Sequence, residues 1–383
     1  MFYATWHDFA LILLTLVVSL GMAWTVWRRL EETPKAGEVL ALYASAACGI
    51  LAVPSFALLQ YMGVGFHSLR WFYHTGAVVP AIVSVVLSAG LWRRGLEPWA
   101  RRLAIALGVF FFSFTPLAVH MTFIAPYQLE IERVRVSVPD ERAGEETIRV
   151  VVLADIQTRG ITSWEERVLD EVHALEPDII LIPGDVLQLP RDVYAQNMGP
   201  MKDWLGRLRA PAGVWMVSGD VDVDARLLAS GTGVEFIDDQ VRSVRVRDRE
   251  VTLGGVTIDY HSAEANDVVR RLETAEGGRD IRLLLAHRPG AVETLSLSRL
   301  GKAETRIDLV VSGHTHGGQI VVPGFGPPVT MSTLERHVAS GGLHEVGGRR
   351  VYVSRGVGME RMGAPQVRFN CPPEVTLLEI GGR

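Results

Sequence analysis

The sequence predicts an α/β domain that follows a hydrophobic region of four membrane-spanning helices. Two patterns lead to this fold class. The first third of the chain contains four long apolar stretches, and the rest alternates short β-branched runs with helical segments. Hydrophobic residues make up 48% of the 383 residues while charged residues stay near average at 21%, so the apolar excess is concentrated in one part of the chain.

The overall composition excludes several classes of protein. The formal net charge is −5 and the pI is about 6.1, which argues against nucleic acid as a partner. Two cysteines, Cys48 and Cys371, are too few for a disulfide framework or a thiolate zinc site. A mean hydropathy of +0.20 excludes a disordered chain.

The four apolar stretches are each long enough to cross about 30 Å of hydrocarbon as a helix. None contains Asp, Glu, Lys or Arg, and tryptophans stand near their ends, where amphipathic rings prefer to lie. One such stretch would equally suit a buried core helix or a signal peptide, but four in succession predict a membrane anchor over residues 1–126. The stretches are Phe9–Trp27, Val39–Val64, Phe72–Trp92 and Leu103–Ala125.

Basic residues in the connecting loops predict the orientation of this anchor. The first and third loops together carry seven Lys and Arg residues, whereas the second loop carries only Arg70. Because cytoplasmic loops carry the excess of positive charge, both termini and the domain after Pro126 are expected outside the cytoplasm. A transporter role for the helices is disfavoured, since no stretch contains a charged residue for coupling.

Residues 127–383 show the pattern of a layered α/β domain. Leu129–Val138 alternates apolar and polar residues, which is typical of an exposed edge strand. Ser163 and Glu166 match a capping box, which predicts a helix that runs to about Leu175.

Five apolar runs of this domain are followed by carboxylate or imidazole side chains. The pairs are Val150–Ala154 before Asp155, Ile179–Pro183 before Asp185, Val214–Ser218 before Asp220, Ile281–Ala286 before His287, and Ile307–Ser312 before His314 and His316. The carboxyl ends of strands in an α/β sheet converge on one crevice, so these side chains are expected to meet there. Mixed oxygen and nitrogen ligands suit Mn²⁺, Fe²⁺ or Zn²⁺.

This ordered set resembles the calcineurin-like metallophosphoesterase superfamily, whose signature is Asp-x-His, Gly-Asp, Gly-Asn-His-Asp/Glu, a lone His and Gly-His-x-His. The resemblance runs from Ile148 to the C-terminus, and its most specific part is Gly313–Gln319. Tyr352–Gly358 and Arg368–Val375 resemble the closing segments of the bacterial membrane-associated branch, which includes phosphodiesterases acting on lipids and lipid precursors. The implied fold over residues 127–383 is a four-layer α/β/β/α sandwich.

The resemblance also implies two divalent metal ions and a role for each matching residue. Asp155 and His316 would hold the first ion, Asp185 would bridge both, and Asp220, His287 and His314 would hold the second. Such a pair activates a hydroxide that attacks a phosphoryl group and clamps the leaving oxygen. Asp185 and Asp220 are therefore candidate catalytic residues as well as ligands.

Three positions depart from the family pattern. Gln157 replaces a histidine, and its neutral amide either binds the first metal weakly, which favours Mn²⁺, or holds no metal. Asp220 replaces an asparagine and adds negative charge, which can strengthen metal binding and weaken the attraction for a phosphate anion. Val221 replaces the histidine that in the family protonates the leaving group or steadies the phosphate, and general acid help is worth about 10²–10⁴-fold in rate.

Other residues are candidates for the functions that these positions lack. His261 is a candidate catalytic acid, with an exposed or capping histidine as the alternative. Arg355 and Arg368 are candidate substrate-binding residues and equally candidate partners in structural ion pairs. Asp222, whose family counterpart orients the missing histidine, is expected to be only a turn residue.

The sequence therefore predicts a membrane-anchored dimetal phosphohydrolase, of phosphodiesterase or pyrophosphatase type, acting on a phosphorylated lipid or lipid-linked precursor. The alternative is a catalytically impaired domain that senses or scaffolds a metal or a phosphorylated ligand. The three departures favour this alternative, and the retained aspartates and histidines argue against it. The expected location is the bacterial cytoplasmic membrane, with the bilayer and a phosphorylated small molecule or lipid as partners and no nucleic acid.

Overall fold

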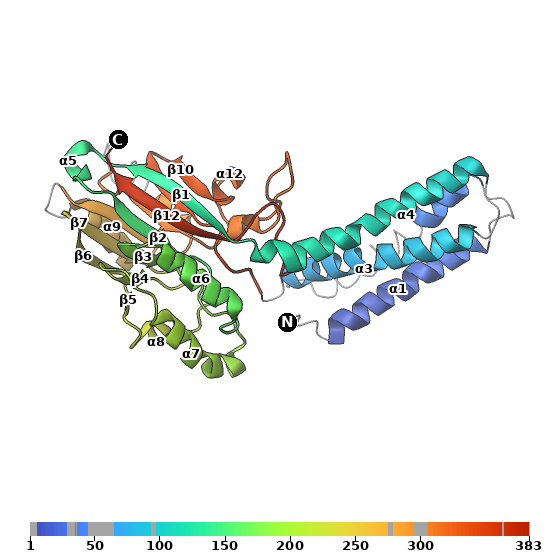
Figure 1. The fold of residues 1–383 in the computed structure, drawn as a ribbon, viewed down its shortest axis with the longest axis horizontal. Coiled ribbons are helices and arrows are strands. Elements are labelled where there is room, and N and C mark those ends of the chain that lie inside the picture. The colour runs from blue at the N-terminus through green and yellow to red at the C-terminus, as the bar shows by residue number, and fades with distance from the viewer. Residues whose placement is uncertain are drawn as a thin grey trace. The chain divides into compact units, whose positions relative to one another are not determined.

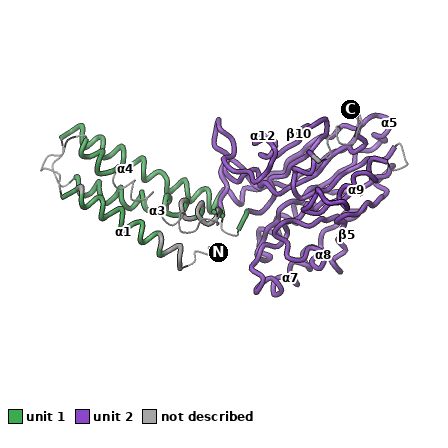
Figure 2. Tube along the Cα trace, turned by 180° about the vertical axis from the view of Figure 1, so that it is seen from behind, with its two compact units in different colours: residues 1–124, 360–366 green, residues 125–359, 367–383 purple. Residues whose placement is uncertain are grey.

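The computed structural model describes residues 6–28, 35, 37–44, 65–92, 97–274, 279–294, 305–361 and 364–382. The chain forms two compact units (Figures 1 and 2). Unit 1 consists of residues 1–124 and 360–366, and unit 2 of residues 125–359 and 367–383. The predicted boundary at residue 126 lies beside this division, whereas the return of residues 360–366 to unit 1 was not expected from the sequence.

The described part of unit 1 within residues 1–124 is mostly helical. It contains α1 (Trp6–Trp27), α3 (Gly65–Trp92), α4 (Pro98–Val119) and a helical segment at 37–44. Two stretches, Tyr73–Trp92 and Pro98–Tyr127, are long and apolar enough to cross a membrane, and α1 contributes a shorter apolar stretch, Ile12–Thr25. The structure thus supplies two candidate spans where the sequence predicts four, and most of the second predicted span lies outside the described residues.

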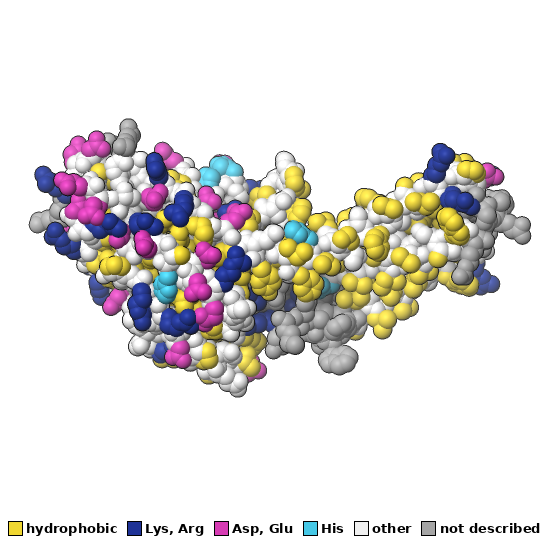
Figure 3. Space-filling model, in the orientation of Figure 1, with side chains coloured by type: hydrophobic (Ala, Val, Ile, Leu, Met, Phe, Trp, Pro, Cys, Tyr) yellow, Lys and Arg dark blue, Asp and Glu magenta, His cyan; other side chains and the backbone are white. Residues whose placement is uncertain are grey.

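The helices of unit 1 carry large hydrophobic side chains on their surface. Val85, Val109 and Phe110 are all more than half exposed. Figure 3 shows hydrophobic side chains over these helices and charged side chains over much of the visible face of unit 2. Helices with an apolar outer surface are typical of a hydrocarbon environment.

Unit 2 is built on two six-stranded sheets. The first has the order β1 (Glu130–Ser137), β12 (Glu374–Gly381), β2 (Ile148–Val152), β3 (Ile179–Ile182), β4 (Val214–Met216) and β5 (Val234–Phe236). The second has the order β10 (Gly342–Val346), β11 (Arg349–Val353), β9 (Leu309–Ser312), β8 (Ile281–Ala286), β7 (Arg249–Val256) and β6 (Gln240–Val246). Most neighbouring strands are parallel, with antiparallel pairs at β12–β2, β10–β11 and β6–β7.

Three clusters of buried side chains hold these sheets and their helices together. Val150 and Val152 of β2 point into the core between the two sheets, whereas Val151 points to the opposite face, as the two-residue period of a strand requires. That outer face packs against α6 (Ser163–Ala174), α7 (Arg191–Leu205) and α8 (Ala225–Ala229). The outer face of the second sheet packs against α9 (Ala263–Thr274), α10 (Ala291–Thr294) and α12 (Arg336–Ala339). A short helix, α5 (Asp140–Ala143), precedes β2.

Two local predictions can be compared with this fold. The edge strand expected at Leu129–Val138 is confirmed as β1, the outermost strand of its sheet. The predicted cap of α6 is wrong by one residue, because the capping box is formed by Thr162 and Glu165. Thr162 has the extended backbone that an N-cap requires, and the carboxylate of Glu165 accepts from its N–H at 2.8 Å.

Candidate metal centre

Side chains from both sheets meet at the carboxyl ends of β2, β3, β4, β8 and β9. Asp155, Asp185 and His287 each place one ligand atom within 4.8 Å of the others, and Asp220, His287 and His314 do the same. His287 belongs to both groups. The second group consists of the residues that the family resemblance implies for the second metal.

The orientation of His287 suits a metal ligand. Its Nδ1 lies 2.7 Å from the carbonyl of Pro183, the residue after β3, so the hydrogen on this nitrogen is donated to the backbone. The other nitrogen, Nε2, then faces Asp185 Oδ2 at 3.4 Å, Asp220 Oδ1 at 3.5 Å and His314 Nδ1 at 3.2 Å. A backbone carbonyl that fixes the ring in this way leaves one nitrogen directed at the cluster.

The carboxylates of the cluster lie close to one another, and Asp155 and Asp185 are buried while the side chain of Asp220 is 24% exposed, which shifts their pKa values in different directions. Burial raises the pKa of Asp155 to about 6, and burial with the charges of Asp222 and Asp155 raises the pKa of Asp185 well above its usual value. Burial acts against the ionisation of Asp220, but hydrogen bonds to His287 and His314 outweigh it and lower its pKa. Burial likewise opposes a charge on His287, yet the surrounding aspartates raise its pKa to about 10.

His316 provides the clearest test of whether a cation fits. The side chain is buried, and among the described residues neither ring nitrogen has a hydrogen-bond partner. Burial, reinforced by the nearby charge of Arg368, lowers the pKa of His316 well below its usual value, so its imidazole is neutral. A buried imidazole without partners is costly unless a ligand satisfies it. His316 lies outside the two groups of ligand atoms that meet within 4.8 Å, but its electrostatic interactions with His314, His287 and Asp220 place it near them. Imidazole and carboxylate donors of this kind suit divalent metal ions.

The backbone at these positions is strained. Asp155, Asp185, His314 and His316 have φ values of 47°, 58°, 73° and 48°, in the left-handed region that non-glycine residues rarely adopt. Each such residue costs about 1–3 kcal/mol, and such residues cluster at functional sites. Close packing accompanies the strain, since a Cβ on Gly313 would lie 2.5 Å from Asp155 Oδ2.

Two neighbouring residues position Asp185. The amide nitrogen of Gln157 donates to Asp185 Oδ2 at 2.8 Å, so the amide supports the carboxylate in the orientation that the structure shows. Asp222, expected to be only a turn residue, accepts from the N–H groups of Asp185, Val186 and Gly219, each at 2.9 Å. It thereby joins the loop after β3 to the loop after β4, a role that was not predicted from the sequence.

Arg288 is a further residue of the site that was not predicted from the sequence. Its guanidinium forms an ion pair with Asp220, with Nη2 and Oδ2 3.1 Å apart, and 41% of its side chain is exposed. The one signal in the sequence is its place directly after His287 at the end of β8. Arg288 offsets part of the negative charge that Asp220 adds to the site.

Three predicted residues lie away from the cluster or have other partners. His261 is exposed before α9, its ring contacts Tyr260, and within the described chain it makes no hydrogen bond or ion pair with the cluster. Arg355 pairs with Glu374 and with two glutamates of β1. Arg368 is fully buried and donates to backbone carbonyls. Arg368 is therefore a structural residue, in place of the substrate contact that the sequence suggested.

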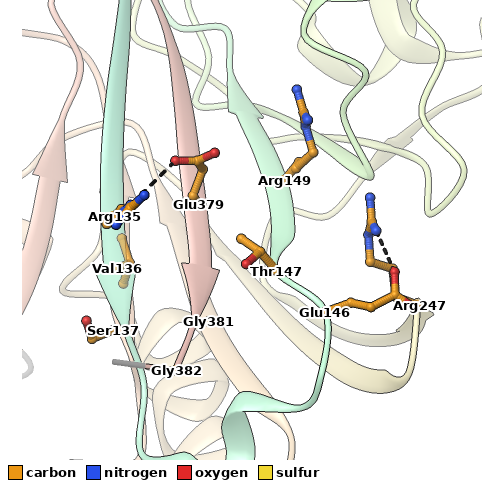
Figure 4. Close-up of a pocket in the computed structure, with 10 residues that line it drawn as sticks. All are labelled: Arg135, Val136, Ser137, Glu146, Thr147, Arg149, Arg247, Glu379, Gly381 and Gly382. Carbon is orange, nitrogen blue, oxygen red and sulfur yellow. Dashed lines mark hydrogen bonds and ion pairs between the residues drawn. The ribbon is translucent and has the colours of Figure 1, made fainter.

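A cavity of about 690 Å³ lies elsewhere on unit 2 (Figure 4). It is lined by the C-terminal ends of β1 and β12 and by residues at the start of β2, so it lies at the other end of β2 from the metal centre. None of the predicted metal ligands lines it. Its Arg247 is paired with Glu146 at 2.6 Å and with Asp178 at 2.8 Å.

Adding Mn²⁺ to the metal-free protein is expected to raise the melting temperature more at pH 7 than at pH 5. The folded-state pKa of Asp155 is raised from 3.8 to about 6, so the metal-free protein loses stability as the pH rises through this range. A bound cation reverses this effect, because the metal displaces the proton and pairs with the carboxylate. Thermal unfolding is measured at both pH values with one fixed Mn²⁺ concentration, set to 100 times the Kd at pH 7, where binding is worth about 2.7 kcal/mol. An Mn²⁺-induced shift that does not change with pH would contradict it.

Comparison with known proteins agrees with this geometry. The sequence model of the calcineurin-like phosphoesterase family matches residues 148–318. The chain is 30% identical over 215 residues to the phosphodiesterase YaeI of Escherichia coli, which covers 54% of this chain and 71% of that protein. It is 27% identical over 252 residues to the uncharacterized metallophosphoesterase YkuE of Bacillus subtilis, which covers 62% of this chain and 80% of that protein.

Two further similarities were found. A transmembrane protein with a metallophosphoesterase domain from Bos taurus is 29% identical over 253 residues, covering 61% of this chain and 52% of that protein. The crystal structure of the calcineurin-like phosphoesterase YfkN from Bacillus subtilis aligns at 11% identity with a TM-score of 0.35, covering 57% of this chain and 87% of that one. From the sequence similarities, the chain belongs to the calcineurin-like metallophosphoesterase family and is a metal-dependent phosphoesterase.

Proposed function

We propose that this chain is a membrane-anchored dimetal phosphohydrolase that cleaves a phosphodiester or pyrophosphate bond in a phosphorylated lipid or lipid-linked precursor. The observation that carries the proposal is the convergence of aspartates and histidines from five strand ends. Near them lies the buried imidazole of His316, which has no hydrogen-bond partner among the described residues. The Escherichia coli relative is named a phosphodiesterase, and the Bos taurus relative is named a transmembrane protein.

Two divalent cations, with Mn²⁺ favoured over Fe²⁺ and Zn²⁺, fit the donor set. When bound, such ions polarise phosphoryl oxygens and make water a nucleophile near neutral pH. The chain's own residues would hold them in a fixed arrangement. Asp155 and His316 would hold the first, Asp220, His287 and His314 the second, and Asp185 would bridge them. The amide of Gln157 and the N–H of Val221, which donates to Asp185 Oδ1 at 3.0 Å, keep the bridging carboxylate in place.

The site favours an anionic substrate with a good leaving group. The guanidinium of Arg288 is partly exposed beside Asp220 and can donate to a phosphoryl oxygen. The side chain of Val221 cannot donate a proton, so an alkoxide leaving group would receive no general acid catalysis from this position. The phosphate side of a pyrophosphate bond departs without such help.

The anchor would hold the site at a membrane. The two apolar stretches of α3 and α4 support this part of the proposal. The excess of Lys and Arg in the first and third predicted loops supports an extracytoplasmic position for unit 2 in a bacterial cytoplasmic membrane.

The proposal is tested by metal reconstitution of the full chain in detergent. After chelation, Mn²⁺, Fe²⁺ or Zn²⁺ is added and the hydrolysis of bis(p-nitrophenyl) phosphate and of a lipid-linked pyrophosphate is measured. We expect turnover that requires metal, that His287→Ala removes and that His337→Ala, at an exposed histidine, leaves unchanged. Tight Mn²⁺ binding without turnover of either substrate would contradict the proposed enzymatic function and support the alternative role as a sensor or scaffold.

Replacing Arg288 with methionine is expected to raise KM for the diester about tenfold, because the charge of Asp220 is then left uncompensated next to an anionic substrate. In an Asp220→Asn background the same replacement should cost less, since that charge is gone. Measuring kcat/KM for the four proteins of this double-mutant cycle gives the coupling. If the free-energy effects of the two replacements are additive, Arg288 does not act through Asp220.

A further inference from the structure

An uncharged and exposed loop adjoins the metal centre. Residues 317–334 contain no Asp, Glu, Lys, Arg or His. We call residues 320–331 the apolar loop, because Val322, Phe325, Val329 and Met331 within it are 39%, 60%, 41% and 58% exposed. In the described part of unit 2, these are four of the seven large hydrophobic side chains that are exposed. Such a concentration of exposed apolar side chains marks an interaction surface.

The apolar loop is held in shape by its own backbone. The N–H of Val322 donates to the carbonyl of Gly326 at 3.0 Å, and the N–H of Phe325 donates to the carbonyl of Val322 at 3.0 Å. Gly324 and Gly326 have φ values of 77° and 83°, which this tight turn requires. The turn therefore presents Phe325 at the tip of an ordered loop.

Both ends of the apolar loop are tied to the rest of unit 2. At one end, the N–H of Val321 donates to the carbonyl of Phe369 at 2.9 Å. At the other, His314 Nε2 lies 3.0 Å from the carbonyl of Met331, within hydrogen-bond distance. His314 is a predicted ligand of the second metal, so the position of the apolar loop is linked directly to the metal centre.

A second apolar segment touches the same centre. Val223 and Leu227, in the loop after β4 and in α8, are 45% and 46% exposed. The N–H of Val221, two residues before Val223, donates to Asp185. Exposed apolar side chains therefore occur on two segments that both contact the predicted ligands.

A basic side chain contacts the tip of the apolar loop. The guanidinium of Arg336 lies over the ring of Phe325, 4.9 Å from its centre. An aromatic side chain next to a basic one suits the boundary between acyl chains and anionic headgroups, where the ring enters the apolar layer and the charge stays at the phosphates. The chain's own candidate spans favour the bilayer as the apolar partner of this loop.

We propose that the apolar loop enters the headgroup region of the bilayer that holds unit 1, which would place the metal centre at the lipid surface. This inference rests on the membrane anchoring in the proposed function, and it goes beyond it by assigning the surface of unit 2 that meets the lipid. A lipid-linked phosphate would then reach the ligands without leaving the interface.

The position of the apolar loop is tested with a nitroxide on Phe325→Cys in a Cys48→Ser background. The full chain is reconstituted in vesicles of phosphatidylethanolamine and phosphatidylglycerol, with Arg245→Cys on exposed β6 as the matched control. We expect oxygen to relax the nitroxide at position 325 more than a water-soluble nickel chelate does, and the reverse at position 245. Equal access of the chelate at both positions would overturn the proposal. Spin–spin broadening between copies would overturn it too, by showing that the loop binds a second chain.

A functional measurement separates this proposal from the proposed activity. Phe325→Ser is expected to lower the turnover of a lipid-linked substrate in vesicles about tenfold, as the loss of one buried aromatic contact would. Hydrolysis of the soluble diester should stay unchanged. An equal loss with both substrates would overturn the proposal, since it would show that the loop merely supports the metal centre. If the unmodified chain hydrolyses neither substrate, the proposed function fails, while the nitroxide measurement still locates the loop.

Discussion

Replacing Asp185 with asparagine is expected to lower kcat/KM on the order of 10³-fold or more, while the fold is retained. Asp185 lies at the centre of the cluster, where Oδ2 accepts from Gln157 at 2.8 Å and lies 3.4 Å from His287 Nε2. Oδ1 accepts from the N–H of Val221 at 3.0 Å. Asparagine has the same shape, but it is neutral and presents a donor to one of these two N–H groups. The replacement thus removes a negative charge from the residue that the family resemblance implies as the bridge between two cations.

The stability of the metal-free protein distinguishes this loss from misfolding. Burial and neighbouring negative charges raise the pKa of Asp185, so its carboxylate is unfavourable at neutral pH without a cation. The asparagine variant should therefore unfold at the same temperature as the unmodified protein or higher when metal is absent. It should gain less from added Mn²⁺, and its metal content by mass spectrometry should fall. Asp170→Asn, at an exposed position of α6, is the matched control. Activity and metal content that match this control would exclude Asp185 from the metal centre.

Replacing Arg368 with methionine is expected to destabilise unit 2 by about 3–5 kcal/mol, because each buried carbonyl that loses its donor costs about 1–3 kcal/mol. The buried guanidinium donates to the carbonyls of Arg355, Gly356, Gly358 and Cys371 at 2.8, 3.0, 2.6 and 3.0 Å. Methionine fills a similar volume but has no donor, so these carbonyls lose their partner in the interior.

The loss would extend to the metal centre through the turn that these carbonyls belong to. The N–H of Gly358 donates to the carbonyl of Asp155 at 2.8 Å, and a Cβ on Gly356 would lie 2.6 Å from the Cβ of Asp155. Arg368 thus supports the backbone against which a predicted ligand packs.

Thermal unfolding measures this effect. For a domain of this size 1 kcal/mol corresponds to about 2–4 °C, so the melting temperature should fall by about 6–20 °C. Arg245→Met, at an exposed arginine of β6, should leave it unchanged. A variant with normal stability and a raised KM would instead return Arg368 to the substrate-binding role that the sequence suggested.

Much of the site's chemistry was predictable from short segments of the chain. The run Ile179–Ile182 followed by Gly184 and Asp185 contains in a few residues both a buried strand and the acidic side chain at its end. Such patterns are local, because the two-residue period of a strand and the turn that ends it depend on adjacent residues. The same holds for the edge strand β1. Even locally, the cap of α6 was misplaced, because neighbouring residues Thr162 and Ser163 are both good N-caps and only the backbone angles distinguish them.

The roles of individual side chains depended on contacts between distant residues. Asp220 and Arg288 are far apart in the chain, as are Asp185 and Asp222, so no local pattern predicts their pairing. From the sequence, Arg368 is equally a candidate substrate contact and a candidate ion-pair partner, and its enclosure by backbone carbonyls decides for a structural role. Adjacent residues were thus enough to indicate strands, turns and the kinds of ligand at their ends, because those follow from local conformational preference. The partners, burial and charge balance of these ligands came from the packing of two sheets against each other, because burial and electrostatic pairing depend on which distant segments are brought together.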